Sequence, residues 1–243
     1  MIEDIAGSLY IAKKDLKEYY LKPGTISWGL VFPIAFTLAF LMKRGELSLW
    51  LVPGMISLAI FFGATSMSAM SIVFERKTGS FERLLLFPIS YTGIALGKSL
   101  SSFFFGLISS MPVIILSYML IHVPPSYPIL LILCIVMATF LSSTFGVLVS
   151  FSVKDPSQTM TVFNLVRFPM MFLSGIIIPL TMFPEPTRIV SLLLPLTYLA
   201  EAIRYSYTGA YDLIPPYISI PVSIILSLVF LVATSFLIKK SIP

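Results

Sequence analysis

The densest group of charged side chains in this chain lies between two long apolar runs, in residues 74–90. Its charged members are Glu75, Arg76, Lys77, Glu82 and Arg83. Apolar side chains are interspersed among them, so the segment is amphipathic as well as charged. Charges of both signs set the specificity and orientation of protein–protein contacts. The sequence therefore predicts a segment, held at a membrane face, on which a soluble partner docks.

A second group, Gly93–Ser99, ends in Gly-Lys-Ser and superficially matches a phosphate-binding loop. That motif requires four residues between its glycines and a strand before them. Here three residues separate Gly93 from Gly97, and the surroundings are those of a membrane interface. We interpret the segment as a short interfacial helix whose Lys98 side chain extends to the lipid head groups. The glycine pair also permits close helix packing.

Catalytic constellations are absent from the sequence. The single histidine, His122, stands beside Pro124-Pro125, and no Gly-x-Ser-x-Gly elbow is present. The single cysteine, Cys134, lies inside an apolar run, which excludes a disulfide framework and a thiolate metal site. We therefore expect neither an enzyme activity nor a cofactor within this chain.

An intramembrane cation is the remaining candidate for chemistry. Arg167 lies about 10 Å into an apolar run, at 1.5 Å per helical residue. Asn164, the only asparagine, precedes it by one helical turn. Arginine at such a depth costs at least ~2.5 kcal/mol, so it usually faces a bundle interior or a polar cavity. Two interpretations stay open: a polar lining of a substrate path, or a side chain that reaches back to cytoplasmic phosphates.

The composition identifies the elements that position these residues. Hydrophobic residues make up 57% of the 243 residues, charged residues only 11%, and the mean hydropathy is +0.98. Soluble domains contain about 25% charged residues, so this is an integral membrane protein. The net charge of +5 is explained by Lys and Arg on membrane-flanking loops, and nucleic-acid binding is not predicted.

Six apolar segments are long enough to cross the ~30 Å hydrocarbon layer as helices. They are Thr25–Met42, Leu51–Val73, Leu100–Ile121, Pro128–Phe151, Met160–Leu180 and Tyr217–Ile238. The predicted fold is thus an all-α polytopic membrane protein with six transmembrane helices.

Basic residues set the orientation of these spans. Eleven lie on one side: Lys13, Lys14, Lys17, Lys22, Arg76, Lys77, Arg83, Lys98, Lys154, Lys239 and Lys240. Four lie on the other: Lys43, Arg44, Arg188 and Arg204. Both termini and the charged segment are therefore predicted to be cytoplasmic.

Two further segments are neither spans nor ordinary loops. Residues 1–24 show apolar residues at near-helical spacing opposite lysines, which predicts an interfacial amphipathic helix before the six-span domain of residues 25–243. Residues 183–213 are apolar but divided by prolines, which predicts two short re-entrant helices at the outer face. Candidate functional residues there are Pro195, Tyr198, Glu201 and Arg204. Glu201 and Arg204, three apart, are expected to pair on one helix face.

Two ordered blocks carry a family resemblance. Glu75–Leu85 followed by Pro88 resembles the cytoplasmic connection of ABC type 2 (DrrB- or NodJ-like) transporter permeases, which typically reads acid, base, two variable residues, Gly, small, apolar, Glu, Arg or Lys, Leu, Leu, and later Pro. The family's C-terminal run is similar to Ser174–Pro179, Phe183-Pro184, Leu194–Tyr198 and Glu201–Arg204. Pro53-Gly54 before the second span also fits. The resemblance covers essentially the whole chain.

The resemblance implies a permease subunit, in the plasma membrane, of an ATP-driven exporter. Its expected partners are a second permease, two cytoplasmic ATPase subunits that bind ATP and Mg²⁺, and membrane lipids. It implies that residues 74–90 form the coupling helix. Polar contacts with the ATPase would come from the five charged residues, Phe81, Leu84 and Leu85 would pack on the permease, and Gly79 would relax the turn before the helix.

Two rival interpretations remain. A secondary transporter would need intramembrane carboxylates, and none lies within the six predicted spans. A non-transporting scaffold is the other rival. The apolar spans favour a hydrophobic or amphiphilic substrate, in the class of drugs, lipids or polysaccharides, over a small ion.

Overall fold

The computed structural model describes residues 2–41 and 47–240. All regular secondary structure within these ranges is helical. The longer helices are α1 (Ile2–Tyr19), α3 (Phe32–Leu41), α4 (Leu47–Thr78), α6 (Tyr91–Ile121), α7 (Pro128–Ser152), α8 (Thr159–Leu173), α10 (Pro195–Thr208) and α11 (Pro216–Lys240). The shorter ones are α2 (Pro23–Ile26), a π-helical turn (Ser27–Val31), α5 (Ser80–Leu84), α9 (Glu185–Leu192) and two 3-10 turns (Pro156–Gln158, Leu180–Met182). The expectation of an all-α polytopic protein is confirmed.

Five helical stretches in the described ranges are long and apolar enough to cross a membrane: Pro23–Phe40, Leu49–Thr78, Tyr91–Ile121, Pro128–Ser152 and Pro216–Lys240. The sixth predicted span, Met160–Leu180, contains a shorter helix. α8 ends at Leu173 and measures about 22 Å, and the backbone from Ser174 to Pro179 is not helical. Gly175, at φ +74°, turns the chain out of the helix, so the predicted helix is too long at its C-terminal end.

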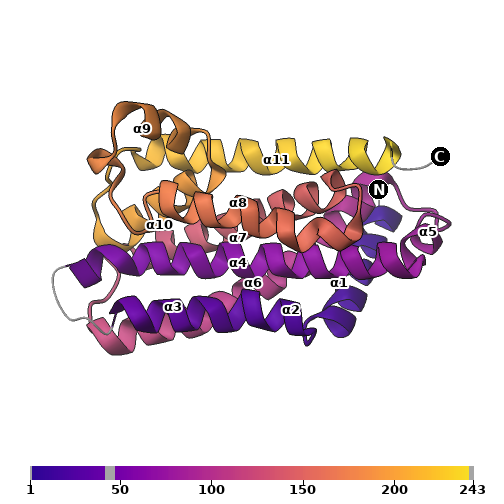
Figure 1. The fold of residues 1–243 in the computed structure, drawn as a ribbon, viewed down its shortest axis with the longest axis horizontal. Helices are drawn as coiled ribbons and strands as arrows, with labels where there is room; N and C mark the ends of the chain where they lie inside the picture. Colours follow the sequence, from indigo (N-terminus) through magenta and orange to yellow (C-terminus); the bar gives the residue numbers. More distant parts are fainter. Residues whose placement is uncertain (1, 42–46, 241–243) are drawn as a thin grey trace.

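Helix α4 lies at the centre of the bundle, and every residue of its most apolar stretch is buried (Figure 1). Small residues bring its neighbour α6 close. A Cβ atom on Gly63 would lie 3.3 Å from the Cα atom of Gly106 and would clash with Ser109. The Ser109 hydroxyl instead donates to the carbonyl of Ala59 at 3.1 Å. This is the close small-residue packing by which helices associate without a hydrophobic driving force in lipid.

Helix α1 packs across the start of α6. Ser8 donates its hydroxyl to the carbonyl of Gly93 at 2.7 Å, and a Cβ atom on Gly97 would lie 2.9 Å from the carbonyl oxygen of Ser8. The close packing predicted for this glycine pair is therefore present, with α1 as the partner. Two of the apolar residues whose near-helical spacing predicts the amphipathic helix, Ile5 and Leu9, are more than half exposed.

The two ends of the bundle differ. The helix α1, the C-terminal end of α11 and α5 lie at one end, and α9 and α10 lie at the other (Figure 1). This arrangement groups the segments predicted to be cytoplasmic and separates them from those predicted to be outside. The two short helices predicted for residues 183–213 are present as α9 and α10, each with a proline at its start. Lys43 and Arg44, counted on the outer side, lie outside the described residues.

Candidate functional site

The charged segment forms the end of one helix and the whole of another. α4 continues beyond the predicted span to Thr78, and α5 begins at Ser80. Gly79 joins them at φ +68°, in the left-handed region where a Cβ atom would be strained. The sharp turn folds α5 back beside the end of the bundle. The expected role of Gly79 in starting the helix agrees with this geometry.

One side of α5 is fixed to the bundle. Phe81 and Leu84 are buried, and the Phe81 ring lies 5.2 Å, between centroids, from the Phe151 ring of α7. Both residues belong to an apolar cluster that includes Ile11 of α1 and Ile238 of α11. Leu85 packs against this cluster and is half-buried. The three apolar residues therefore pack on the helical bundle as expected.

The opposite side of α5 is open. Lys77, Glu82 and Arg83 are exposed, and so are two apolar residues, Leu86 (86%) and Phe87 (60%). A cleft of about 270 Å³ separates this side from α1, where the exposed Tyr10 lies. Exposed charged and apolar side chains thus occur together in the short stretch from the end of α4 to just beyond α5. Sequence reasoning missed Leu86 and Phe87, because a run of four apolar residues does not show which of them face outward.

Two charged residues assigned to docking face the other way. Arg76 donates from one guanidinium nitrogen to the carbonyl of Val153 at 2.7 Å and from another to that of Lys154 at 3.0 Å. It thus fixes the α7–α8 connection to the end of α4. Glu75 is fully buried. Its assignment to the docking surface is wrong, because the last turns of α4 rotate its side chain toward α1 and α6.

Glu75 belongs to a buried ion network with Asp15, Lys14 and Lys98. The Lys98 ammonium contacts Asp15 Oδ2 at 2.8 Å and also the Glu75 carboxylate, and Lys14 contacts Glu75 and, at 3.2 Å, Asp15 Oδ1. Asp15, Glu75 and Lys98 are fully buried. Two carboxylates and two ammonium groups balance, which satisfies the requirement that buried charges be paired. The interpretation of Lys98 as a head-group contact is therefore wrong.

The pKa values of Asp15 and Lys14, the two network residues on α1, reflect this environment. Burial raises the pKa of Asp15 above its ordinary value, and the Lys98 ammonium opposes that rise. Burial also acts to lower the pKa of Lys14, but the carboxylates of Asp15 and Glu75 outweigh it and raise that pKa. The network joins α1, the end of α4 and the start of α6 directly beside α5.

At the other end of the bundle, Glu201 and Arg204 of α10 are fully buried and paired, as predicted from their spacing. Arg204 also donates to the carbonyl of Gly175 at 2.5 Å, and its guanidinium carbon lies 3.8 Å from the centroid of the Trp50 ring. The second oxygen of Glu201 accepts from the backbone N–H of Asp212 at 2.8 Å. The pair therefore ties α10 to α4, to the end of α8 and to the segment before α11.

The other two candidates in this segment have local roles. Pro195 begins α10, where a missing N–H costs nothing. Tyr198 donates its hydroxyl to the carbonyl of Leu192 at 2.7 Å and closes the turn between α9 and α10. Neither residue is positioned by these contacts to bind a ligand.

Arg167 of α8 is also fully buried, but its surroundings are different. Its guanidinium carbon lies 4.6 Å from the centroid of the Phe163 ring and 5.3 Å from that of Phe62 on α4. Among the described residues, its three guanidinium nitrogens have no hydrogen-bond partner. The buried Oδ1 atom of the half-buried Asn164 has none there either. The interpretation of Arg167 as reaching back to phosphates does not agree with complete burial between aromatic rings.

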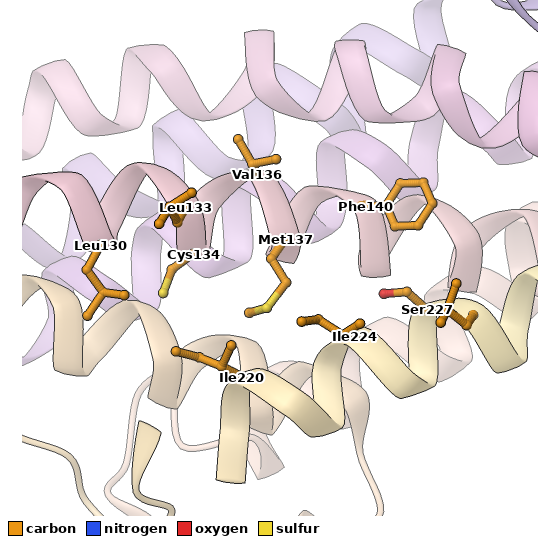
Figure 2. A pocket seen from close by; sticks show the side chains of 10 residues that line it. Leu130, Leu133, Cys134, Val136, Met137, Phe140, Ile220, Ile224 and Ser227 are labelled. Atoms are coloured by element: carbon orange, nitrogen blue, oxygen red, sulfur yellow. The ribbon is translucent and has the colours of Figure 1, made fainter. Parts of the chain in front are cut away.

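A groove of about 420 Å³ runs between α7 and α11 and is lined by apolar side chains such as Leu133, Met137 and Ile224 (Figure 2). Its one hydroxyl, that of Ser227, donates to the carbonyl of Ser223 within α11. No charged group lines the groove, so it contains nothing that would orient a polar ligand.

Comparisons of the sequence with known proteins match most of the chain to one family. Residues 9–208 match the family model described as "ABC-2 type transporter". The chain belongs to the ABC-2 type transporter family. It is 24% identical over 203 residues to "Putative transport permease ycf38" of Cyanophora paradoxa, covering 77% of this chain and 69% of that protein. It is 23% identical over 189 residues to "Probable multidrug ABC transporter permease YbhS" of Escherichia coli K12, covering 76% of this chain and 48% of that protein.

Membership of the ABC-2 type transporter family makes this chain a multi-pass permease of an ABC transporter system. The matched region includes α5, the ion network, Arg167 and the Glu201–Arg204 pair. The structure brings Phe81, Glu82 and Arg83 together on one short helix. It separates them from Glu75, from Asn164 and Arg167 in mid-bundle, and from α10 at the far end.

Proposed function

We propose that this chain is the membrane subunit of an ATP-driven exporter and that α5 docks on a separate ATPase subunit. The observation that supports the proposal is the exposed side of α5. Lys77 at the end of α4, Glu82 and Arg83 on α5, and Leu86 and Phe87 just after it are all exposed. Apolar side chains within a polar rim are the usual anatomy of a protein–protein interface.

The attachment of α5 suits the transmission of movement. Phe81 and Leu84 fix it in the bundle, and the turn at Gly79 connects it directly to the central helix α4. The ion network locks the same end of α4 to α1 and α6. A push on α5 would therefore move these helices as one rigid group, in the manner of rigid-body allosteric transitions.

The proposed assembly contains two such permeases and two ATPase subunits, which bind ATP and Mg²⁺. The excess of basic residues at the α5 end orients that end to the cytoplasm, with the bundle in the plasma membrane. The exported molecule is hydrophobic or amphiphilic, because the spans offer extensive apolar surface and few charged groups.

The decisive experiment is a pull-down of the tagged, detergent-solubilised chain from its own host, with bound proteins identified by mass spectrometry. We expect an ATPase subunit to co-purify with the wild type. Glu82→Ala/Arg83→Ala and Leu86→Asp/Phe87→Asp should reduce its recovery by roughly thirtyfold, since central interface residues contribute about 2 kcal/mol or more.

The matched control is Glu185→Ala/Arg188→Ala, which removes one acid and one base at the opposite end of the bundle. This variant should retain the ATPase, and all variants should elute as folded protein in size-exclusion chromatography. Absence of any ATPase with the wild type, or equal recovery with the α5 variants, would overturn the proposal.

A further inference from the structure

Six charged residues are fully buried within the part of the chain that the structure describes: Asp15, Glu75, Lys98, Arg167, Glu201 and Arg204. Five of them take part in the ion pairs described above. Arg167 alone in those ranges has no such partner, and all three of its guanidinium nitrogens are without acceptors there. Arginine stays protonated in proteins, so this site holds a positive charge and five N–H donors in an apolar environment.

Structural explanations account poorly for this arginine. It is 0% exposed in the single chain, so an acidic residue of a second copy docking on the outside does not reach it. The two rings beside it offer cation–π attraction but no hydrogen-bond acceptor in the plane of the guanidinium. A buried charge without a counter-ion is strongly unfavourable, and such residues in membranes mark functional sites.

Arg167 lies beside a larger aromatic cluster, of which Phe62 is a member. The Phe168 ring, next to it on α8, contacts the rings of Trp28, Phe32 and Phe62 at centroid distances of 6.0, 6.1 and 6.2 Å. These rings come from the first two spans and α8. Together they combine an apolar, aromatic wall with a single forked cation, whose planar donors match the oxygens of a carboxylate or a phosphate.

We propose that Arg167 binds the acidic group of an anionic amphiphile, whose apolar part lies against the aromatic residues of the first span, α4 and α8. This inference rests on the proposed transport function and specifies its substrate class. A phosphate or carboxylate on an apolar chain is the shared chemistry, whether the molecule is the exported one or a bilayer lipid.

Two features of α8, the helix that bears Arg167, weaken its hold on the bundle. Pro169 lacks the N–H that would bond to the carbonyl of Leu165, which weakens α8 in its second half. The helix has only 15 residues and ends in the turn at Gly175. Because Arg167 is enclosed between α8 and α4, the acidic group enters when these helices separate in a minor open state that the permease populates by itself.

The test measures binding to the permease alone, in phosphatidylcholine nanodiscs. In a Trp50→Phe background Trp28 is the only tryptophan, and it contacts Phe168 of the proposed site. Dodecyl phosphate, dodecanol and dodecyltrimethylammonium are titrated and the Trp28 fluorescence is recorded. We expect dodecyl phosphate to bind about tenfold more tightly than dodecanol, the effect of one hydrogen-bonded charge contact. The cationic probe should bind most weakly.

Three variants in the same background make the result specific. Arg167→Met should remove the preference for dodecyl phosphate, and Arg167→Lys, which keeps the charge, should retain part of it. Lys13→Met removes an exposed cation of α1 and should leave the preference intact. Equal affinities for dodecyl phosphate and dodecanol in the parent, or a preference that persists in Arg167→Met, would overturn the proposal.

Nanodiscs containing phosphatidylglycerol identify the source of the ligand. Weaker apparent binding of dodecyl phosphate there assigns the site to a bilayer lipid, and unchanged binding assigns it to a transported amphiphile; both support the acid-group chemistry. No ATPase is needed in this assay. A failed preference would therefore leave the docking proposal standing, and a failed pull-down would leave this binding result standing.

Discussion

Arg204 and Arg167 are two buried arginines in opposite circumstances. Both are fully buried and both lie over aromatic rings. Arg204 has a carboxylate three residues earlier and a backbone carbonyl as acceptors. Arg167 has Asn164 at the same spacing, and no acceptor among the described residues. Among the described residues, Arg204 thus has acceptors for both terminal nitrogens and lacks one only at Nε, whereas Arg167 has none for any of its three nitrogens.

The difference separates a structural role from a binding role. A charge paired within the chain stabilises one arrangement of the segments that supply the pair, and its loss leaves the other charge exposed to an apolar interior. An unpaired charge contributes no such stability and is available to an external anion. Arg204 therefore fixes the α9–α10 end of the bundle, whereas our proposal assigns Arg167 to a ligand.

The largest effect is expected from breaking the satisfied site. Glu201→Ala leaves the Arg204 charge buried without its counter-ion and removes the acceptor of the Asp212 backbone N–H. We expect destabilisation by about 3–5 kcal/mol. Scanning fluorimetry in detergent should show the unfolding midpoint lowered by roughly 10 °C. An unchanged midpoint would show that the pair does not hold the segments at the α9–α10 end together.

A smaller effect is expected at the ion network, where a second cation remains. Lys98→Met leaves Asp15 and Glu75 with Lys14 alone. We expect destabilisation by about 2–3 kcal/mol, which is less than the cost of leaving a buried charge with no counter-ion. Trypsin should cleave α1 at Lys13 and Lys17 faster, since α1 loses its anchor. Adding Glu75→Gln should restore part of the resistance, because it rebalances the charge; equal cleavage of all three proteins would contradict the role of the network.

Replacing each arginine with methionine compares the contributions of the two sites to stability directly. Arg167→Met should leave the unfolding midpoint unchanged or raise it by a few degrees, because it replaces an unpaired charge with an apolar side chain of similar length. Arg204→Met should lower the midpoint, because Glu201 then remains as a buried carboxylate. Equal destabilisation by both substitutions would show that Arg167 has an internal structural role.

Short-range patterns in the sequence were sufficient to predict many of the helices and one of the buried ion pairs. Apolar runs predict α4, α6, α7 and α11, and the prolines of residues 183–213 predict two short helices. The pair Glu201–Arg204 follows from helical spacing alone. The buried side of α5, with Phe81 and Leu84, follows from the family resemblance of this segment.

Long-range contacts account for what the sequence did not reveal. Glu75 and Asp15 lie 23 and 83 residues from Lys98, so nothing local indicates that they meet. Hydropathy does not distinguish a residue that faces lipid from one that faces protein or solvent, which is why the exposure of Leu86 and Phe87 escaped prediction. The early end of α8 depends on the turn at Gly175, which is held by Arg204 from another helix.

The smallest effect on stability should come from making the two sites alike. Asn164→Asp places a carboxylate three residues before Arg167, the spacing of Glu201 and Arg204, with almost no change in volume. A new pair of this kind stabilises a helix by about 0.2–0.5 kcal/mol in water, so the midpoint should rise by no more than a few degrees.

The effect of Asn164→Asp on binding should be larger than its effect on stability. An internal carboxylate competes for the guanidinium, so the affinity for dodecyl phosphate should fall about tenfold to that of dodecanol. Asn164→Ser, which removes the amide without adding charge, should retain the preference. If Asn164→Asp binds dodecyl phosphate as tightly as the parent, Arg167 does not contact the acidic group, and the contrast between the two arginines does not extend to function.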